Sequence, residues 1–257
     1  MNTTDPRPVC VVTGSSSGIG AATALLFAQR GHDVVINYAK QAENAERVAD
    51  ACRQAGADAL LVRADVADDA QCRALAEAVR QRWGRADVLV NSAGITTKFA
   101  DPRDLEALSA QDFEAIYRVN VIGTFQMCRA LAPLLREGRT PAIVNISSIG
   151  GRMGTGSSMA YAASKGAVNT LTLSLARALA PAIRVNAILP GMVDGPWLRR
   201  GLGDAVFEER RQRYAARALL QSVLQPEDVA RAAWSLATDA LKQTGQLVDL
   251  EAGFLLG

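Results

Sequence analysis

Short apolar runs alternate along the chain with longer stretches in which apolar residues recur at helical spacing. The apolar runs are continuous, as in VCVV, VLV and AIVNI, which is typical of strands that are covered on both faces. Seven strands are predicted, over residues 9–13, 33–38, 58–63, 87–91, 142–147, 183–189 and 246–251. Helices are predicted between them, near residues 18–30, 41–55, 68–83, 109–137, 159–180 and 226–237.

The order strand, helix, strand repeats without interruption, which predicts a parallel sheet with right-handed crossovers. No linker rich in proline or serine divides the chain, so we expect one domain over residues 9–257, preceded by a loose tail over residues 1–8. Seven strands, and a glycine-rich turn directly after the first, favour an open sheet over an eight-stranded barrel. We therefore predict an α/β fold, a single-domain Rossmann-type doubly wound parallel sheet. In such a sheet, ligands bind beyond the carboxyl ends of the strands.

Composition and charge narrow the class of protein. The chain has 257 residues, of which 49% are hydrophobic and 21% charged, the balance of a globular protein rather than a disordered one. The 28 basic and 26 acidic residues leave a net charge of +2, too small to indicate a nucleic-acid or membrane-surface partner. No apolar run approaches the roughly 18 residues that span a bilayer. The polar start of the chain does not read as a signal peptide, so we expect a cytoplasmic protein.

Cysteine and histidine offer little for metal binding or acid–base chemistry. The four cysteines, Cys10, Cys52, Cys72 and Cys128, form no C-x-x-C pair, and His32 is the sole histidine. We expect four free thiols and no metal site. His32 follows a glycine at the end of a predicted helix, which favours a capping or solvent-exposed side chain.

A glycine-rich turn, T-G-S-S-S-G-I-G, follows the first strand and opens the next helix. Gly14 would permit the tight turn, Gly18 would let the backbone approach a pyrophosphate, and Gly20 would allow close packing of helix on strand. Free N–H groups and the positive end of the helix dipole suit a phosphate, although such a turn can also serve only to redirect the chain. The residues expected to contact a dinucleotide here are Gly14, Ser15, Ser16, Ser17, Gly18, Ile19 and Gly20.

The end of the second strand indicates which dinucleotide would bind. An acidic residue there would bond the ribose hydroxyls and repel a 2′-phosphate, but the strand ends in N-Y-A followed by Lys40. Because Lys40 offers a cation and Ser15, Ser16 and Asn37 offer neutral donors, NADP(H) is favoured over NAD(H). The alternative is a Lys40 that is merely solvated. Further expected cofactor contacts, at the ends of the second, third and fourth strands, are Asn37, Tyr38, Lys40, Asp65, Asn91, Ala93 and Gly94.

Tyr161 and Lys165 lie four residues apart in a predicted helix and so share one face. A tyrosine has a pKa of about 10, too high for a base at neutral pH, and a nearby ammonium group would lower it. Such a pair alone could arise by chance. Ser148, however, follows a strand at the ligand-binding edge and precedes Tyr161 by 13 residues, enough to return the chain to the same cleft. Its hydroxyl could hold a substrate oxygen while Tyr161 exchanges a proton.

Together these motifs resemble the classical short-chain dehydrogenase/reductase family from about residue 9 onward. The matching segments are T-G-x-x-x-G-x-G over residues 13–20, N-x-A-G over 91–94, Ser148, and Y-x-x-x-K over 161–165, in the family's order. The resemblance implies hydride transfer between a nicotinamide cofactor and a small carbonyl or secondary-alcohol substrate. It makes Tyr161 the general acid/base, with Ser148 on the substrate oxygen and Lys165 on the nicotinamide ribose. Asn120 would bend its helix and order a water beside Lys165.

The resemblance also bears on the rest of the pocket. Pro190 and Gly191 match the turn that borders the nicotinamide, and Val66 and Val193 complete the expected cofactor contacts. Gly195 stands where the family usually has a threonine. The turn at 180–183 lacks the arginine that acyl-carrier-protein reductases of the family tend to carry, which argues against a carrier-protein substrate.

Residues 192–224 are expected to form a lid over the substrate pocket. The lid is rich in arginine, which could attract an anionic substrate such as a coenzyme A thioester or a phosphate, or could simply face solvent. Other expected pocket residues are Thr96, Gly150, Met153 and Met192. The arginines are Arg199, Arg200, Arg210, Arg211, Arg213 and Arg217.

Two wider alternatives concern activity and assembly. A non-catalytic dinucleotide-binding regulator on the same fold is the alternative to an enzyme, but it would have no reason to hold the four catalytic residue types together.

The helices at 109–137 and 159–180 carry more apolar residues than one stripe against the sheet requires. The resemblance implies a homotetramer, or a homodimer, through these helices. The apolar residues in question are Ile116, Val119, Met127, Leu131, Leu134, Leu135, Leu171, Leu173 and Leu175.

Overall fold

The computed structural model describes residues 6–101 and 103–257. Its described part contains seven parallel strands in the order β3-β2-β1-β4-β5-β6-β7, which confirms the open doubly wound sheet. Every strand lies within one residue of its predicted bounds, because continuous apolar runs mark buried strands clearly. The strands are β1 (Val9–Thr13), β2 (Asp33–Tyr38), β3 (Ala59–Arg63), β4 (Val88–Asn91), β5 (Ala142–Ile146), β6 (Arg184–Pro190) and β7 (Leu247–Leu250).

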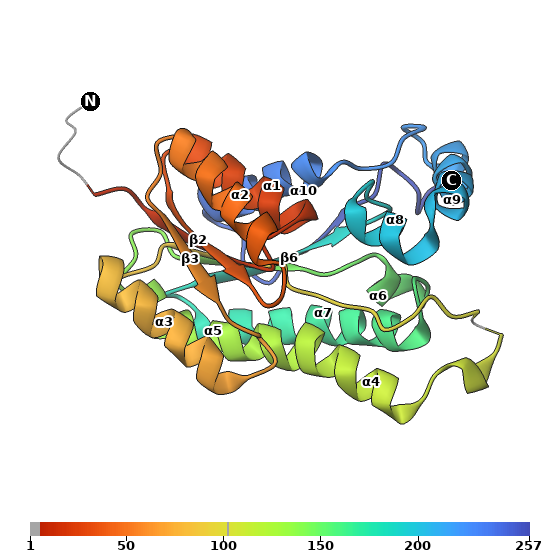
Figure 1. Ribbon diagram of the computed structural model, residues 1–257, viewed down its shortest axis with the longest axis horizontal. Helices are drawn as coiled ribbons and strands as arrows, with labels where there is room; N and C mark the ends of the chain where they lie inside the picture. Colours follow the sequence, from red (N-terminus) through yellow and green to blue (C-terminus); the bar gives the residue numbers. More distant parts are fainter. Residues whose placement is uncertain (1–5, 102) are drawn as a thin grey trace.

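Helices cover both faces of the sheet (Figure 1). One face carries α1 (Gly18–Gln29), α2 (Ala42–Gln54) and α10 (Pro226–Trp234), which ends in a π-helical turn over Ser235–Asp239. The other carries α3 (Asp69–Trp83), α5 (Thr124–Leu135) and α7 (Met159–Leu179), with α4 (Ala110–Tyr117) leading into α5. Beyond the carboxyl ends of the strands lie α6 (Gly150–Met153), α8 (Pro196–Leu202), α9 (Asp204–Arg217) and a 3-10 turn over Leu105–Ala107.

The single helix predicted over residues 109–137 is interrupted. It consists of α4 and α5 joined by a π-helical turn over Arg118–Gly123 that contains Asn120, in line with the local bend expected there. The Thr124 hydroxyl donates to the carbonyl of Asn120 at 2.8 Å within this turn. Gly123 lies close to Val66, because a Cβ at that position would lie 2.7 Å from the Val66 side chain. Turns of this kind occur often at functional sites.

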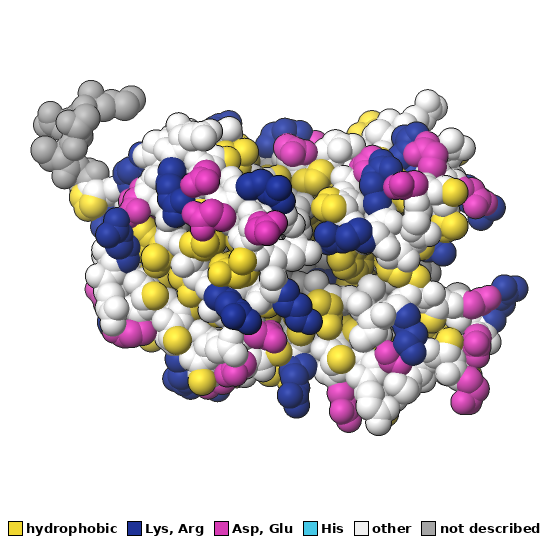
Figure 2. All heavy atoms as spheres, viewed as in Figure 1, with side chains coloured by type: hydrophobic (Ala, Val, Ile, Leu, Met, Phe, Trp, Pro, Cys, Tyr) yellow, Lys and Arg dark blue, Asp and Glu magenta, His cyan; other side chains and the backbone are white. Residues whose placement is uncertain are grey.

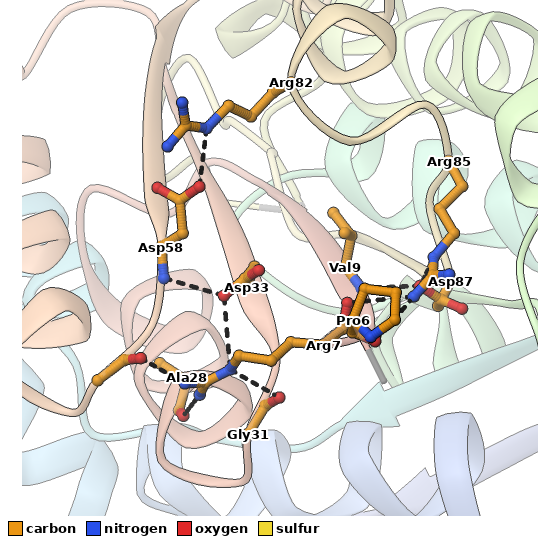
Figure 3. Close-up of polar contacts among 11 residues, drawn as sticks. Pro6, Arg7, Val9, Ala28, Gly31, Asp33, Asp58, Arg82, Arg85 and Asp87 are labelled. Atoms are coloured by element: carbon orange, nitrogen blue, oxygen red, sulfur yellow. Dashed lines mark hydrogen bonds and ion pairs between the residues drawn. The ribbon is translucent and has the colours of Figure 1, made fainter. Parts of the chain in front are cut away.

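Within the predicted loose tail, Pro6 and Arg7 form hydrogen bonds with the rest of the chain (Figure 3). Residues 1–5 of that tail lie outside the described part. Arg7 donates its Nε to the carbonyl of Gly31 at 3.1 Å and its Nη2 to that of Ala28 at 3.3 Å. Arg85 donates to the carbonyl of Pro6 at 3.1 Å. Two guanidinium groups thus attach the start of the chain to the amino-terminal edge of the sheet.

His32 is buried, so the expected capping or solvent-exposed side chain is wrong. Only 6% of its surface is exposed, and its ring lies 5.0 Å from that of Phe27 and 5.2 Å from that of Trp234. Trp234 comes from α10, about two hundred residues along the chain, so local sequence could not indicate this contact. Burial lowers the pKa of His32 to about 4.

The state of the cysteines matches the prediction of free thiols. All four cysteines are buried and free, and the described residues contain no cluster able to hold a metal ion. None of the helices in the described ranges is both long and apolar enough to cross a membrane. On the face drawn in Figure 2, basic and acidic side chains alternate, and a notch separates the α8–α9 end from the α4 end.

Most of the apolar residues on which the predicted assembly was based are buried within their own chain. Ile116, Met127, Leu131, Leu134 and Leu135 are at most 1% exposed, so they need no partner chain. The last four pack in the core between the sheet and α3. Different side chains on the same helices are exposed: Phe113 (38%), Ile122 (48%) and Phe125 (41%).

Candidate active site

The glycine-rich turn packs tightly against the end of β4. The hydroxyl of Thr13, the last residue of β1, accepts the N–H groups of Ser92 at 3.0 Å and Ala93 at 3.1 Å. Gly14 has φ +63°, and a Cβ there would lie 2.8 Å from the Cα of Ala93. A Cβ at Gly20 would lie 2.5 Å from the carbonyl oxygen of Gly14. The absence of side chains at these positions lets the amino end of α1 approach the strands.

Asn37 and Ser15 hold the turn in place, and their side chains are therefore committed inside the protein. Asn37 Oδ1 accepts the N–H of Gly14 at 3.2 Å, and its Nδ2 donates to the carbonyl of Ala64 at 2.9 Å. The Ser15 hydroxyl donates to the carbonyl of Val12 and accepts the N–H of Asn37, both at 2.9 Å. These groups are not the neutral donors toward a cofactor that the sequence suggested.

A cavity of about 510 Å³ follows the carboxyl edge of the sheet from the glycine-rich turn to α8. Its lining contains every predicted cofactor residue except Ser15 and Asn91. Asn91 points into the core instead, where its Nδ2 donates to Asn145 Oδ1 at 2.9 Å, and Asn145 in turn donates to Thr172 at 2.9 Å. The lining residues that the sequence indicated are Gly14, Ser16, Ser17, Gly18, Ile19, Gly20, Asn37, Tyr38, Lys40, Asp65, Val66, Ala93, Gly94, Tyr161, Lys165, Pro190, Gly191 and Val193.

Few charged side chains line the end of this cavity near β2. Lys40 is exposed, and its ammonium group has no hydrogen-bond or ion-pair partner among the residues that the structure describes. Asp65 uses one carboxylate oxygen to accept the N–H of Ala67 at 3.0 Å. No carboxylate stands among residues 37–41, which line this end of the cavity.

Tyr161, Ser148 and Lys165 come together where β5 ends and α7 begins. Ser158 caps α7 by accepting the N–H of Tyr161 at 3.1 Å, which fixes the first turn of the helix. Ser148 forms a hydrogen bond with Tyr161 and accepts the N–H of Gly150 at 3.0 Å. Lys165 Nζ lies 5.6 Å from the centre of the Tyr161 ring. The structure thus unites the three residues that the spacing predicted.

The charge states differ from the expectation that Lys165 lowers the pKa of Tyr161. Burial raises the pKa of Tyr161 to about 12, and the hydrogen bond from Ser148 acts in the opposite direction. Burial lowers the pKa of Lys165 to about 8. Lys165 Nζ donates instead to the carbonyl of Ile146 at 2.8 Å. The Tyr161 hydroxyl is therefore protonated at neutral pH and able to donate.

Asn120 joins the π-helical turn to the segment after β4. Its Oδ1 accepts the N–H of Ile95 at 2.8 Å, and its Nδ2 donates to the carbonyl of Ile95 and to Ser164 Oγ, both at 3.0 Å. Ser164 donates in turn to the carbonyl of Tyr161 at 2.7 Å. Asn120 thus positions α7, and Ser164 is a supporting residue that the sequence analysis missed. The signal was its place three residues after Tyr161, on the same helix face.

A second supporting serine also escaped notice. Ser147 donates to the carbonyl of Lys165 at 3.0 Å and contacts Asn169 Oδ1 at 2.6 Å, and both Ser147 and Asn169 are buried. These bonds attach the end of β5 to α7 next to Ser148. They fix the distance between the two elements that carry the hydroxyl groups.

A second cavity, of about 460 Å³, adjoins the first. Ser148 and Tyr161 line both cavities. Trp197 of α8 lies over this junction, its ring 5.6 Å from that of Tyr161 and 5.9 Å from that of Phe99. Of the pocket residues expected from sequence, Gly150, Met153 and Met192 line the second cavity and Thr96 lines the first; the sequence analysis missed Phe99 and Phe254.

The expected lid, residues 192–224, contains α8 and α9. Gly195, at the position where a threonine was expected, precedes α8 and lines the first cavity with its backbone. Tyr214 of α9 donates to the carbonyl of Glu251 at 2.8 Å and stacks on Phe254, with ring centres 4.2 Å apart. These contacts bring the segment after β7 against the lid.

Comparisons with known proteins agree with this arrangement. A family model described as enoyl-(acyl carrier protein) reductase matches residues 14–254. A protein of Streptomyces violaceoruber, named as ketoacyl reductase 2 of the granaticin polyketide synthase, is 39% identical over 96% of this chain and 95% of its own. The 3-oxoacyl-[acyl-carrier-protein] reductase of Staphylococcus aureus is 34% identical over 96% and 97% of the two chains.

A solved structure is similar over almost the whole fold. The aldohexose dehydrogenase of Thermoplasma acidophilum, in ligand-free form, superposes with a TM-score of 0.85 at 29% identity, covering 98% of this chain and 95% of that one. The family match spans nearly the whole chain. The chain belongs to the short-chain dehydrogenase/reductase family and is an oxidoreductase that acts on CH–OH or carbonyl groups.

Proposed function

We propose that this enzyme is an NADP(H)-preferring carbonyl reductase and alcohol dehydrogenase in which Tyr161 exchanges the proton. The observation that carries the proposal is the position of Tyr161 and Ser148 on the wall shared by two cavities. One cavity follows the glycine-rich turn along the edge of the sheet, as a dinucleotide requires. The other is lined by apolar and aromatic side chains together with three arginines.

The first cavity fits a dinucleotide. Gly14 and Gly20 let the amino end of α1 lie close to the strands. That end of the helix faces the cavity through Ser17, Gly18 and Ile19. These N–H groups would bind the pyrophosphate, and Lys165 would bind the nicotinamide ribose. When bound, the nicotinamide supplies or accepts the hydride at the substrate carbon.

The protein side of the reaction is proton transfer. In the reductive direction, the Ser148 hydroxyl holds the carbonyl oxygen and Tyr161 donates its proton to that oxygen as hydride reaches the carbon. The raised pKa of Tyr161 keeps this proton in place until charge develops on the oxygen. Lys165, which lies beside the ring of Tyr161, would hold the nicotinamide ribose next to this hydroxyl group.

The preference for NADP(H) rests on the β2 end of the cavity. Residues 37–41 include no carboxylate, so nothing there repels a 2′-phosphate, and Lys40 is available to attract it. Because Lys40 is exposed, its contribution is screened by solvent, and a roughly tenfold preference is the scale to expect.

A spectrophotometric screen with NADPH and NADH tests the proposal. Ketones, sugars and 3-oxoacyl thioesters are incubated with the enzyme, and consumption of reduced cofactor is followed. We expect reduction of at least one ketone or thioester, faster with NADPH at low cofactor concentration. Absence of reduction with every carbonyl class, or a tenfold preference for NADH, contradicts the proposal.

A further inference from the structure

The arginines of the lid fall into distinct groups in the structure. Arg199 donates to both carboxylate oxygens of Asp194, at 2.9 and 3.0 Å. Arg211 binds both oxygens of Glu208 in the same way, at 2.9 and 2.6 Å. These two guanidinium groups are neutralised within the lid and offer little to a ligand.

Three other arginines line the second cavity. Arg210, Arg213 and Arg217 lie three and four residues apart and so share one face of α9. The described residues that line this cavity include no Asp, Glu or Lys, so its ionised side chains are all arginines. A cavity of one charge, next to the reacting hydroxyls, favours a ligand of the opposite charge.

The three guanidinium groups differ in how far they are already satisfied. Arg213 forms an exposed ion pair with Glu209 at 2.6 Å, and Arg217 donates to the carbonyl of Gly257 at 3.0 Å. Arg210 has no hydrogen bond or ion pair with any residue in the described ranges. All of its donors remain available to a ligand in the cavity.

The remaining walls are apolar and aromatic. Phe99, Met153, Trp197, Leu202 and Phe254 line the cavity together with Tyr161. A ligand that fills it therefore meets hydrophobic contact along its body, hydroxyl groups at Ser148 and Tyr161, and cationic groups along α9. A matching ligand therefore has an apolar body, an oxygen that binds the hydroxyl groups and a group that binds the cations.

We propose that the substrate carries an anionic group, a carboxylate or a phosphate, which Arg210 binds while the carbonyl group lies at Tyr161. Arg217 adds positive potential on the same helix face. This inference rests on the proposed function, since it takes the second cavity as the substrate site. It names a substrate class: apolar carbonyl compounds with a negative charge at a distance from the reacting carbon.

Matched pairs of ketones test the proposal. 4-Acetylbenzoate is compared with its methyl ester for the carboxylate, and 4-acetylphenyl phosphate with 4-methoxyacetophenone for the phosphate. We expect kcat/KM with NADPH to be about tenfold higher for the anion in at least one pair, the size of one charge-assisted hydrogen bond. The pair that shows the larger ratio distinguishes carboxylate from phosphate.

Two variants test whether Arg210 causes the preference for anionic ketones. Arg210→Gln should reduce the ratio between the kcat/KM values for anion and neutral ketone to within about twofold, chiefly through the KM of the anion. Arg211→Gln is the matched control on the same helix, because Arg211 is already paired with Glu208, and it should keep the full ratio. Equal rates for anions and neutral ketones in the wild type, or an unchanged ratio in Arg210→Gln, overturns the inference.

The design separates this inference from the proposed function. If neutral ketones are reduced but anions gain nothing, only the anion site fails. If no ketone is reduced, the proposed function fails, and the anion site is still decided by calorimetric binding of 4-acetylbenzoate and 4-acetylphenyl phosphate in the presence of NADPH. Binding of either that is lost in Arg210→Gln but kept in Arg211→Gln then supports the site, and absence of such binding overturns it.

Discussion

His32 gives the protein a pH dependence of stability that can be worked out before it is measured. The residue is the sole histidine, and burial lowers its pKa from 6.5 to about 4. The folded state therefore holds the neutral ring, whereas the unfolded chain takes up a proton as the pH falls through about 6.5. The contribution of His32 to the free energy of unfolding is fully present above that pH. It is lost progressively as the pH falls toward the folded-state pKa.

The magnitude follows from the two pKa values. Between about pH 7 and pH 5 the unfolded chain gains most of a proton at His32 while the folded protein gains almost none, which costs about 2 kcal/mol of unfolding free energy. Carboxylates with strongly lowered pKa values, such as Asp112 and Glu208, affect stability mainly below about pH 5, because their unfolded-state pKa values are about 4. The loss is therefore attributable to one side chain.

This loss of unfolding free energy is measured by urea unfolding of the wild type and of His32→Leu. Both proteins are unfolded at about pH 7 and about pH 5, at matched protein concentration. Leucine has a similar volume and can occupy the space between Phe27 and Trp234 without titrating. We expect the wild type to lose about 2 kcal/mol more than the variant on acidification. Equal losses of unfolding free energy in the two proteins would refute the reasoning. A folded-state pKa near 6.5 for the His32 imidazole, measured by NMR titration, would refute it as well.

Three further predictions concern other parts of the molecule. Tyr38→Asp places a carboxylate at the end of β2 and should reverse the cofactor preference toward NADH in a calorimetric titration, whereas an unchanged preference would show that this end of the cavity does not contact the 2′-phosphate. Arg7→Ala removes the hydrogen bonds to the carbonyls of Gly31 and Ala28 and should lower the free energy of chemical unfolding by about 2 kcal/mol. A change near zero would mean that water replaces these hydrogen bonds without loss of stability. Phe125 is 41% exposed on α5, so light scattering should give the wild type a mass of two or four times 27.2 kDa and Phe125→Glu a smaller one; a wild-type monomer contradicts assembly through this surface.

The fold could be predicted because its signals are local. Apolar and β-branched segments between the predicted helices marked the seven strands, and the glycine-rich turn favoured the open sheet. The π-helical turn at Arg118–Gly123 could not be predicted in this way, because it depends on the packing of Gly123 against Val66 from another element. Helices α8 and α9 were likewise missed, since Phe207 and Tyr214 give α9 only a narrow apolar face among many charges.

Within the candidate site, residue types were easier to predict than side-chain roles. The spacing brought Ser148, Tyr161 and Lys165 together, but it could not show that Ser15 turns inward to the carbonyl of Val12. Nor could it show that Asn91 turns into the core toward Asn145. The predicted lowering of the pKa of Tyr161 failed because it took no account of burial, which acts in the opposite direction.

The central claim is that Tyr161 donates the proton, and single-turnover reduction of a ketone by the NADPH-bound enzyme tests it most directly. Tyr161→Phe is compared with wild type and with Tyr117→Phe, a partly buried tyrosine on α4 outside both cavities. We predict a loss of about 10²–10⁴-fold for Tyr161→Phe, with NADPH affinity nearly unchanged, and no loss for Tyr117→Phe. A Tyr161→Phe enzyme that binds NADPH and retains most of the wild-type rate would show that the proton comes from another group.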